Sequence, residues 1–135
     1  MKNLIFLIAV ILACCAFTYG PFNSKTESGY SSHRLSDSTF TVSFWGDKKT
    51  SMKTTIGFCF LRAAQIGKII GCNFFTTTEP NLYERIVEIR NKNDTVKIVR
   101  PRCSFDVTYY HSKPITTSTI YHCDFVIKNI NKNFK

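Results

Sequence analysis

Hydrophobic and polar positions follow two different periods along this chain, and each period predicts a different element. Residues 39–45 alternate strictly, so Phe40, Val42 and Phe44 share one face of a strand, and residues 102–110 alternate in the same way. Over residues 52–70 the spacing changes to three and four, which predicts an amphipathic helix. Its hydrophobic stripe is Ile56, Cys59, Phe60, Ala63, Ile66 and Ile70.

The boundaries of this helix carry signals of their own. Thr50 or Ser51 is a suitable N-cap, and Gly71 is a suitable residue to end the helix. A second strand is expected over residues 72–78, where Pro80 ends the extended run.

The remaining segments are less periodic. Residues 84–90 and 95–100 are rich in β-formers and predict a hairpin, although Leu82, Ile86 and Ile89 would also suit a short helix. Residues 123–134 have helical spacing, which favours a terminal helix over a last strand. Residues 16–38 are rich in Ser, Thr and Gly without a period, which is typical of a tether.

These elements predict one α+β domain over residues 39–135. The helix at 52–70 is expected to pack on a small mixed or antiparallel sheet, with a further helix at the C-terminus. A chain of 135 residues has room for a single such domain and a short appendage.

The amino terminus has the outline of a secretory signal peptide. Lys2 precedes an uncharged hydrophobic run, residues 4–13, which is too short to cross a bilayer as a permanent helix. The run ends in Leu12-Ala13-Cys14, which resembles the bacterial lipobox and predicts a signal peptide over 1–13 and a diacylglyceryl group on Cys14. Cys15 offers a poorer second register. The alternative is ordinary cleavage after Ala16, which would remove both cysteines.

Charge narrows the class of partner. The sequence has 18 Lys and Arg against 9 Asp and Glu, a net charge of +9, which favours anionic partners such as lipid headgroups or glycans. An export signal argues against nucleic acid as the partner. The basic residues expected to contact an anionic surface are Arg85, Arg90, Lys92, Lys97, Arg100 and Arg102, and the alternative is a solvated sheet face.

Four cysteines lie within the predicted domain: Cys59, Cys72, Cys103 and Cys123. An oxidising envelope would permit up to two disulfides with three full pairings, and buried free thiols are the alternative. Their dispersion, without a Cys-x-x-Cys pair, argues against a zinc site, so we expect no metal or cofactor.

Catalytic chemistry is not favoured by the pattern. His122, Cys123 and Asp124 are sequence neighbours that point in different directions in a strand or a helix, so they cannot converge with His111 on one substrate. An enzyme would instead need groups from separate elements, such as His111 with Asp106 or Arg62. We therefore expect a protein that is not an enzyme.

Two motifs together resemble a family of small envelope lipoproteins of Gram-negative bacteria that lack assigned biochemistry. One is the strand motif Phe40-Thr41-Val42-Ser43-Phe44-Trp45-Gly46, and the other is the helix motif Phe60-Leu61-Arg62-Ala63-Ala64-Gln65, which leads to Gly71-Cys72-Asn73-Phe74-Phe75. Phe40, Gln65 and Cys72 depart from the family's Tyr, Glu and aromatic residues.

The resemblance implies a non-catalytic interaction or structural module, anchored through Cys14 to the outer membrane and facing the periplasm. Cys15, in place of an Asp that retains such proteins at the inner membrane, favours the outer membrane. Its partner would be an envelope protein or an anionic glycan or lipid. The alternative is a soluble secreted protein that binds anionic host or envelope components.

Overall fold

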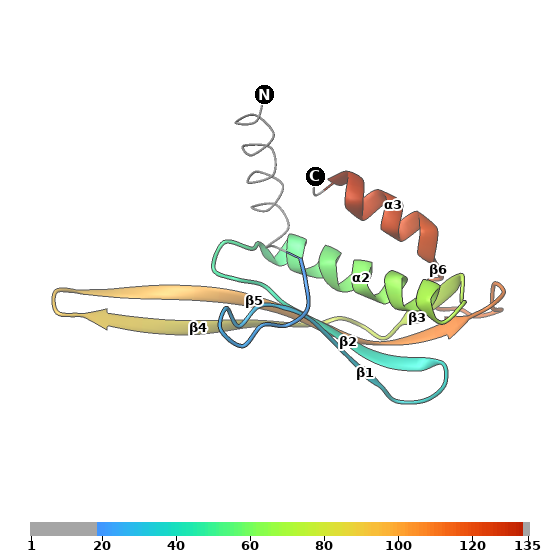
Figure 1. The fold of residues 1–135 in the computed structure, drawn as a ribbon, viewed down its shortest axis with the longest axis horizontal. Coiled ribbons are helices and arrows are strands. Elements are labelled where there is room, and N and C mark those ends of the chain that lie inside the picture. Colours follow the sequence, from blue (N-terminus) through green and yellow to red (C-terminus); the bar gives the residue numbers. More distant parts are fainter. Residues whose placement is uncertain (1–18, 134–135) are drawn as a thin grey trace, which may run out of the picture.

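Six strands form one sheet, and each pairing between these strands is antiparallel (Figure 1). The structure is a computed structural model that describes residues 19–133. The strands are β1 (Gly29–Arg34), β2 (Thr39–Trp45), β3 (Phe74–Thr77), β4 (Asn81–Asn91), β5 (Asp94–Tyr110) and β6 (Tyr121–His122). The helices are α2 (Met52–Ile69) and α3 (Cys123–Asn133). α2 lies on one face of the sheet, and α3 packs on α2.

The fold class predicted from the sequence is wrong. The sequence predicts one main helix on a small sheet, whereas strands make up 43% of the structure and helices 25%. The reason is that β4 and β5 are much longer than their local patterns indicate, and β1 has no recognisable hydrophobic pattern.

β5 is the centre of the sheet and gives it the order β1-β2-β5-β3-β6, with β4 also on β5. β2 pairs with the second half of β5 along one side, whereas β4 and β3 follow each other along the other side. Between them, Thr78 donates its backbone N–H to Asp106 and accepts the Asp106 N–H on its hydroxyl, both at 2.9 Å. This irregular step keeps β3 and β4 on one partner strand.

Residues 19–38, which belong to the segment predicted as a tether, are part of the fold. β1 lies at Gly29–Arg34 and pairs with β2 along its whole length. Tyr19 packs its ring on Phe58 at 5.1 Å and donates a hydrogen bond of 2.6 Å to Gln65. The ordered region therefore begins well before residue 39, the predicted start of the domain.

α2 forms as its pattern predicts and lies close to the sheet because its inner face is small. Ser51 caps the helix by accepting the Thr54 N–H at 3.1 Å, and Gly71 follows the helix with a φ of 80°. Ala63 and Ala64 are completely buried. A Cβ added at Gly67 would lie 2.6 Å from Cys123 Sγ, so this position leaves no room for a side chain.

Several other predictions are confirmed. The predicted strand 39–45 is β2, the predicted helix 52–70 is α2, and the hairpin rather than the short helix forms over residues 84–100. The expected terminal helix is α3. The strand predicted over 72–78 is shorter in the structure, where β3 spans Phe74–Thr77. The strand predicted at 102–110 is the second half of β5 and is continuous with the hairpin.

Candidate anion-binding site

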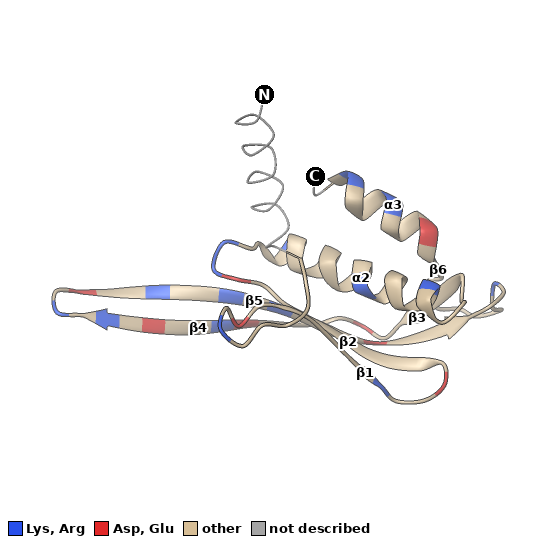
Figure 2. Ribbon diagram, in the orientation of Figure 1, with Lys and Arg blue, Asp and Glu red and all other residues tan. Residues whose placement is uncertain are grey.

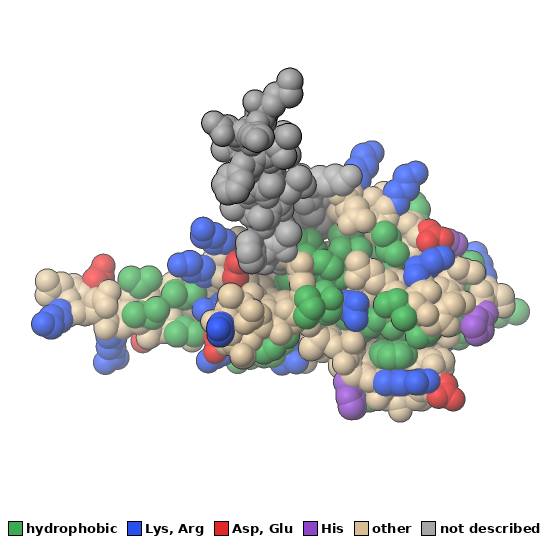
Figure 3. Space-filling model, in the orientation of Figure 1, with side chains coloured by type: hydrophobic (Ala, Val, Ile, Leu, Met, Phe, Trp, Pro, Cys, Tyr) green, Lys and Arg blue, Asp and Glu red, His purple; other side chains and the backbone are tan. Residues whose placement is uncertain are grey.

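β4 and β5 extend beyond the rest of the sheet as a two-stranded arm, here defined as residues 84–101 (Figure 1). The last pairing of β2 with β5 joins Trp45 and Arg102, so the arm has no third strand beside it. Exposed hydrophobic side chains lie along it (Figure 3), and Lys and Arg positions are spaced along both of its strands (Figure 2). Because an isolated hairpin has little stability of its own and uncovered apolar side chains are unfavourable in water, the arm is a candidate contact surface.

Alternation along the two strands sorts the arm's charges onto two faces. Cys103 is buried toward α2, so its partner Leu82 and every second residue from there face the helix side. Glu84 and Glu88 lie on that side. Arg85 and Arg100 are paired with each other on the opposite, open side of the sheet. The acidic side chains of β4 therefore point away from these arginines.

The six basic residues predicted as a single anionic-surface contact thus lie in three places. Arg85, Arg100 and Arg102 face the open side, Arg90 and Lys97 face the helix side, and Lys92 lies in the turn at the tip. Lys97 already pairs with Glu88 at 3.6 Å. The structure brings together only the first three, at the base of the arm.

A pocket of about 400 Å³ opens on the open face at this base. It is lined by Trp45, Asn81, Tyr83, Arg85, Arg102 and Ser104. The neighbouring open face of the sheet is polar, with Thr41 donating to Asp106 at 2.6 Å and Ser43 donating to Ser104 at 2.9 Å. The pocket thus combines two guanidinium groups with neutral hydrogen-bonding side chains.

Arg102 is held in place by its stacking partner. Its guanidinium carbon lies 4.1 Å from the centroid of the Trp45 ring, a cation–π distance. The Arg102 Nε is buried and has no hydrogen-bond partner among the described residues. A guanidinium fixed in this way loses little conformational entropy when it binds an anion.

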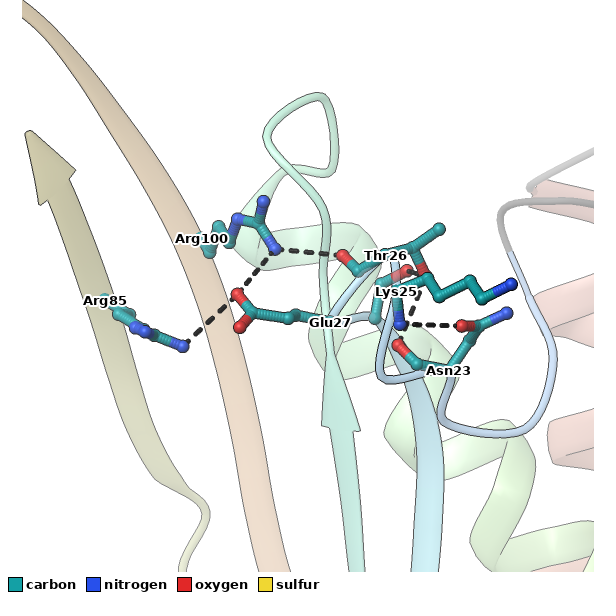
Figure 4. A network of polar contacts seen from close by, with 7 residues as sticks. Asn23, Lys25, Thr26, Glu27, Arg85 and Arg100 are labelled. Carbon is teal, nitrogen blue, oxygen red and sulfur yellow. Dashed lines mark hydrogen bonds and ion pairs between the residues drawn. The ribbon is translucent and has the colours of Figure 1, made fainter. Parts of the chain in front are cut away.

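The Glu27 carboxylate lies beside Arg85 and Arg100 (Figure 4). Its Oε2 lies 3.3 Å from Arg85 and 3.1 Å from Arg100, and Arg100 also donates to the Thr26 carbonyl at 2.9 Å. Glu27 has a φ of 51° in a tight loop whose neighbour Lys25 donates its N–H to Asn23 at 2.9 Å. A side chain from the N-terminal loop therefore partly neutralises the arginine cluster.

The four cysteines predicted as candidate disulfide partners are buried free thiols in the structure. Cys59 donates toward the carbonyls of Val42 and Cys103, both at 3.6 Å. A hydrogen bond with the Cys103 thiol and burial raise the pKa of Cys59. Cys72 lies 3.8 Å from His111 Nδ1, and burial raises the pKa of the Cys72 thiol. Disulfide formation stays a prediction.

The groups considered for catalysis lie apart. Asp106 is engaged with Thr41 on the open face, and Arg62 lies over the Tyr30 ring at 4.2 Å on the helix side. His122 packs against Phe74 at 5.0 Å, while its neighbour Cys123 is completely buried. Within residues 19–133, no group of three or more His, Cys, Asp or Glu is arranged to hold a metal ion.

Sequence reasoning missed four of the six residues that line the pocket. Trp45, Asn81, Tyr83 and Ser104 come from β2, β4 and β5, and Glu27 comes from a segment predicted to be a tether. One signal was present: Trp45 continues the alternation of its strand on the polar side, where an aromatic residue is unusual. No local pattern relates it to Arg102.

No protein-family model, no curated protein and no solved structure matches this chain. The resemblance to envelope lipoproteins therefore rests only on the strand motif at residues 40–46 and the helix motif that follows it. The predicted lipidation site Cys14 lies outside the described residues. Among the described helices, neither is long and apolar enough to span a membrane.

Proposed function

We propose that this protein is a non-catalytic interaction module of the cell envelope that binds the phosphate or carboxylate groups of a glycan or lipid headgroup at Arg85 and Arg102. The observation that carries the proposal is the pocket at the base of the arm, where two guanidinium groups share a polar cavity with Asn81, Tyr83 and Ser104. Guanidinium groups bind phosphate and carboxylate in a bidentate geometry, which suits anions more than cations or neutral ligands.

The neighbouring groups support an anionic ligand. Asn81, Tyr83 and Ser104 carry neutral donors for the hydroxyl groups or further oxygens of such a ligand. Glu27 lies beside the cluster and pairs with Arg85 and Arg100. An incoming anion would compete with this carboxylate, so the site is expected to prefer ligands with more than one negative charge.

Binding is a better explanation than catalysis for this site. The described residues that line the pocket include no His, Cys, Asp, Glu or Lys to act as a general base or metal ligand, so the hydroxyl groups of Tyr83 and Ser104 have no such base beside them in the lining. His111, His122 and Asp124 lie elsewhere, and Asp124 pairs with Lys68 at 3.2 Å. The proposal therefore assigns no reaction to the protein.

We further propose that the module is exported and anchored through a lipid on Cys14, facing the periplasm from the outer membrane. The support is the hydrophobic run at residues 4–13 and the lipobox-like Leu12-Ala13-Cys14. A lipidated cysteine with several acyl chains gives stable anchoring. The intact mass and amino terminus of protein from an envelope fraction test this: a diacylglyceryl group on Cys14 supports the anchor, and a free chain that starts at Phe17 contradicts it.

The binding site is tested with two anionic probes and matched charge changes. The wild-type chain is titrated with phosphatidylglycerol vesicles and with a soluble phosphorylated oligosaccharide, which separates a lipid source from a glycan source. Arg102→Gln and Arg85→Gln remove a guanidinium from the pocket. Lys97→Gln removes the same charge from the other face of the same arm.

The expected result is that the two pocket variants weaken binding at least about tenfold while Lys97→Gln leaves it within about twofold, because a bidentate pair is worth more than diffuse attraction. Equal weakening by all three variants would show only nonspecific charge attraction and would contradict the site. Absence of wild-type binding to both probes at low salt would contradict the proposed function as a whole.

A further inference from the structure

A second and larger cavity lies on the other side of the molecule, between α2 and α3. Its volume is about 990 Å³, at the upper end of the range for small-molecule sites. The main hydrophobic lining residues are Ile56 and Phe60 of α2, Tyr121 of β6, and Phe125, Val126 and Ile130 of α3. Hydrophobic side chains reach the surface around these helices (Figure 3).

The lining residues form an elongated groove with a fixed floor. Ile56 and Phe60 are four residues apart on α2, and Val126 and Ile130 are four residues apart on α3, so each helix contributes a row along its own axis. Phe60 is held by Phe105 at 4.8 Å and by Tyr121 at 5.0 Å between ring centroids. The groove is therefore preformed and suits a linear apolar chain.

The hydrophobic groove is incompletely covered by the described residues. Phe125 is 67% exposed although it lines the cavity, and leaving such a side chain in water is unfavourable. Gly57 lies between Ile56 and Phe60 on α2 and adds no side chain to fill the space. An apolar ligand would remove both defects.

The charged side chain that lines the groove is basic. Among the described lining residues, Lys53 is the one Lys, Arg, Asp or Glu, and it lies one turn before Ile56 at the start of α2. Asn129 and Asn133 line the groove from the last turns of α3, which also carry Lys132. An anionic headgroup beside Lys53 would find a cation and amide donors, and none of the described lining residues is acidic.

We propose that the α2–α3 groove binds a single-chain fatty acid, with the acyl chain along Ile56, Phe60, Val126 and Ile130 and the carboxylate at Lys53. The row geometry and the apolar lining point to one flexible chain, and Lys53 points to a carboxylate head. The site shares no residue with the pocket at Arg85 and Arg102, so it goes beyond the proposed function and can fail or succeed independently of it.

The test uses the full chain, stripped of bound lipid, and fluorescent 11-(dansylamino)undecanoic acid as the probe. Displacement by laurate is compared with displacement by 1-dodecanol, a neutral ligand of the same chain length. We expect saturable probe binding and displacement by both ligands. We expect Lys53→Ser to weaken laurate about twofold to fivefold, as for a partly exposed ion pair, and to leave 1-dodecanol unchanged.

A second pair of variants tests the position of the chain. Ile130→Asp places a carboxylate in the groove and should weaken both ligands at least about tenfold. Ile69→Asp makes the same change at a residue of α2 that is 74% exposed and does not line the groove, so it should leave binding unchanged. Circular dichroism establishes that each variant is folded, and if Ile130→Asp is not, Lys53→Ser decides alone.

Three results would overturn the proposal. The first is a wild-type chain that shows no saturable binding of the probe. The second is equal loss of binding in Ile69→Asp and Ile130→Asp, which would place the chain elsewhere. The third is a Lys53→Ser variant that changes laurate and 1-dodecanol affinities equally, which would remove the carboxylate from the groove.

Discussion

Arg102 lies over the Trp45 ring, with its guanidinium carbon 4.1 Å from the ring centroid, at the point where β1 and β2 end and the sheet narrows to the two strands β4 and β5. Trp45 and Arg102 form the last pairing of β2 with β5, and the arm begins at the next residue pair. This residue pair therefore joins the sheet to the candidate site: Trp45 lies on the polar face of the sheet, and Arg102 belongs to the arginine cluster at the base of the arm.

Glu27→Gln is expected to increase the affinity for the anionic probe about twofold to fivefold. The carboxylate lies 3.3 Å from Arg85 and 3.1 Å from Arg100, so removing its charge frees cations for the ligand. Titration of wild-type and variant protein at the same ionic strength measures this. Asp37→Asn removes a carboxylate that pairs with Arg34 at 2.8 Å and is the matched control. Lower affinity in Glu27→Gln would mean that the glutamate helps to hold the ligand.

Local periodicity was sufficient for the elements that bury one continuous face. β2 and α2 match their predicted ranges because Val42, Phe44 and Ala63 belong to uninterrupted patterns of period two and of period three to four. β1 escaped prediction because it is an edge strand whose side chains are mostly polar. Tyr30 is its one large residue packed against the core, and Ser31, Ser32 and His33 carry no hydrophobic signal.

Pro101 explains why one long strand was read as two. A proline normally ends a strand because it has no N–H. The Pro101 carbonyl points toward the β2 side, where it accepts the Gly46 N–H at 2.7 Å. The N–H and carbonyl of one strand residue point to the same edge, so the N–H that Pro101 lacks would also point toward the β2 side, just beyond the end of β2. The ladder to β4 is unaffected, and the strand continues. The pocket at Arg102 could not be predicted from local patterns, because residues of three separate strands line it.

Tyr109→Phe is expected to lower the free energy of unfolding by about 1 kcal/mol, the usual value of a buried neutral hydrogen bond. The Tyr109 hydroxyl donates to the Ala63 carbonyl at 2.6 Å and links β5 to α2, and the residue is only 3% exposed. Urea unfolding measures the change. Tyr110→Phe, one residue later on the same strand and on its other face, should cost less. Equal costs would mean that this hydrogen bond does not stabilise the packing of α2.

Stability is expected to fall above about pH 9 under reducing conditions, in part because of Cys123. Burial raises the pKa of this thiol from 9.0 to about 11, so the unfolded chain releases the proton first as pH rises. The stabilising contribution is complete below pH 9.0 and is lost between there and about 11. One such thiol contributes roughly 1 kcal/mol to the loss at pH 10.

Urea unfolding of wild-type and Cys123→Ala protein at pH 8 and pH 10 isolates this contribution. The variant should be less stable at both pH values because a buried side chain is shortened, yet its loss between them should be smaller by about that 1 kcal/mol. An equal loss in both proteins would show that Cys123 is not a source of the alkaline sensitivity. Cys59, whose pKa is also raised, would then be the next thiol to replace.

Gly67→Ala is expected to destabilise the protein by about 1 to 3 kcal/mol, although alanine favours helix formation. The new Cβ would lie 2.6 Å from Cys123 Sγ and 3.0 Å from the Tyr109 ring. Cys123→Ala removes the nearer of these atoms, so the double variant should recover part of the loss. A double-mutant cycle from urea unfolding measures the coupling, and additive costs would contradict the close approach of α2 and α3 at Gly67.

Shortening the arm is expected to leave the body of the fold intact. Replacing residues 88–97 with Asn-Gly joins Val87 to Ile98, a hydrogen-bonded pair of the hairpin, through a two-residue turn of a favoured type. The removed strands contact mainly each other and bury none of the core, so the midpoint of urea unfolding should change little. Arg85, Arg100 and Arg102 remain, and anion binding at the pocket should survive. Loss of folding would show that the arm stabilises the sheet. Loss of binding in a folded variant would instead place part of the anion site on the removed segment, beyond the pocket proposed for it.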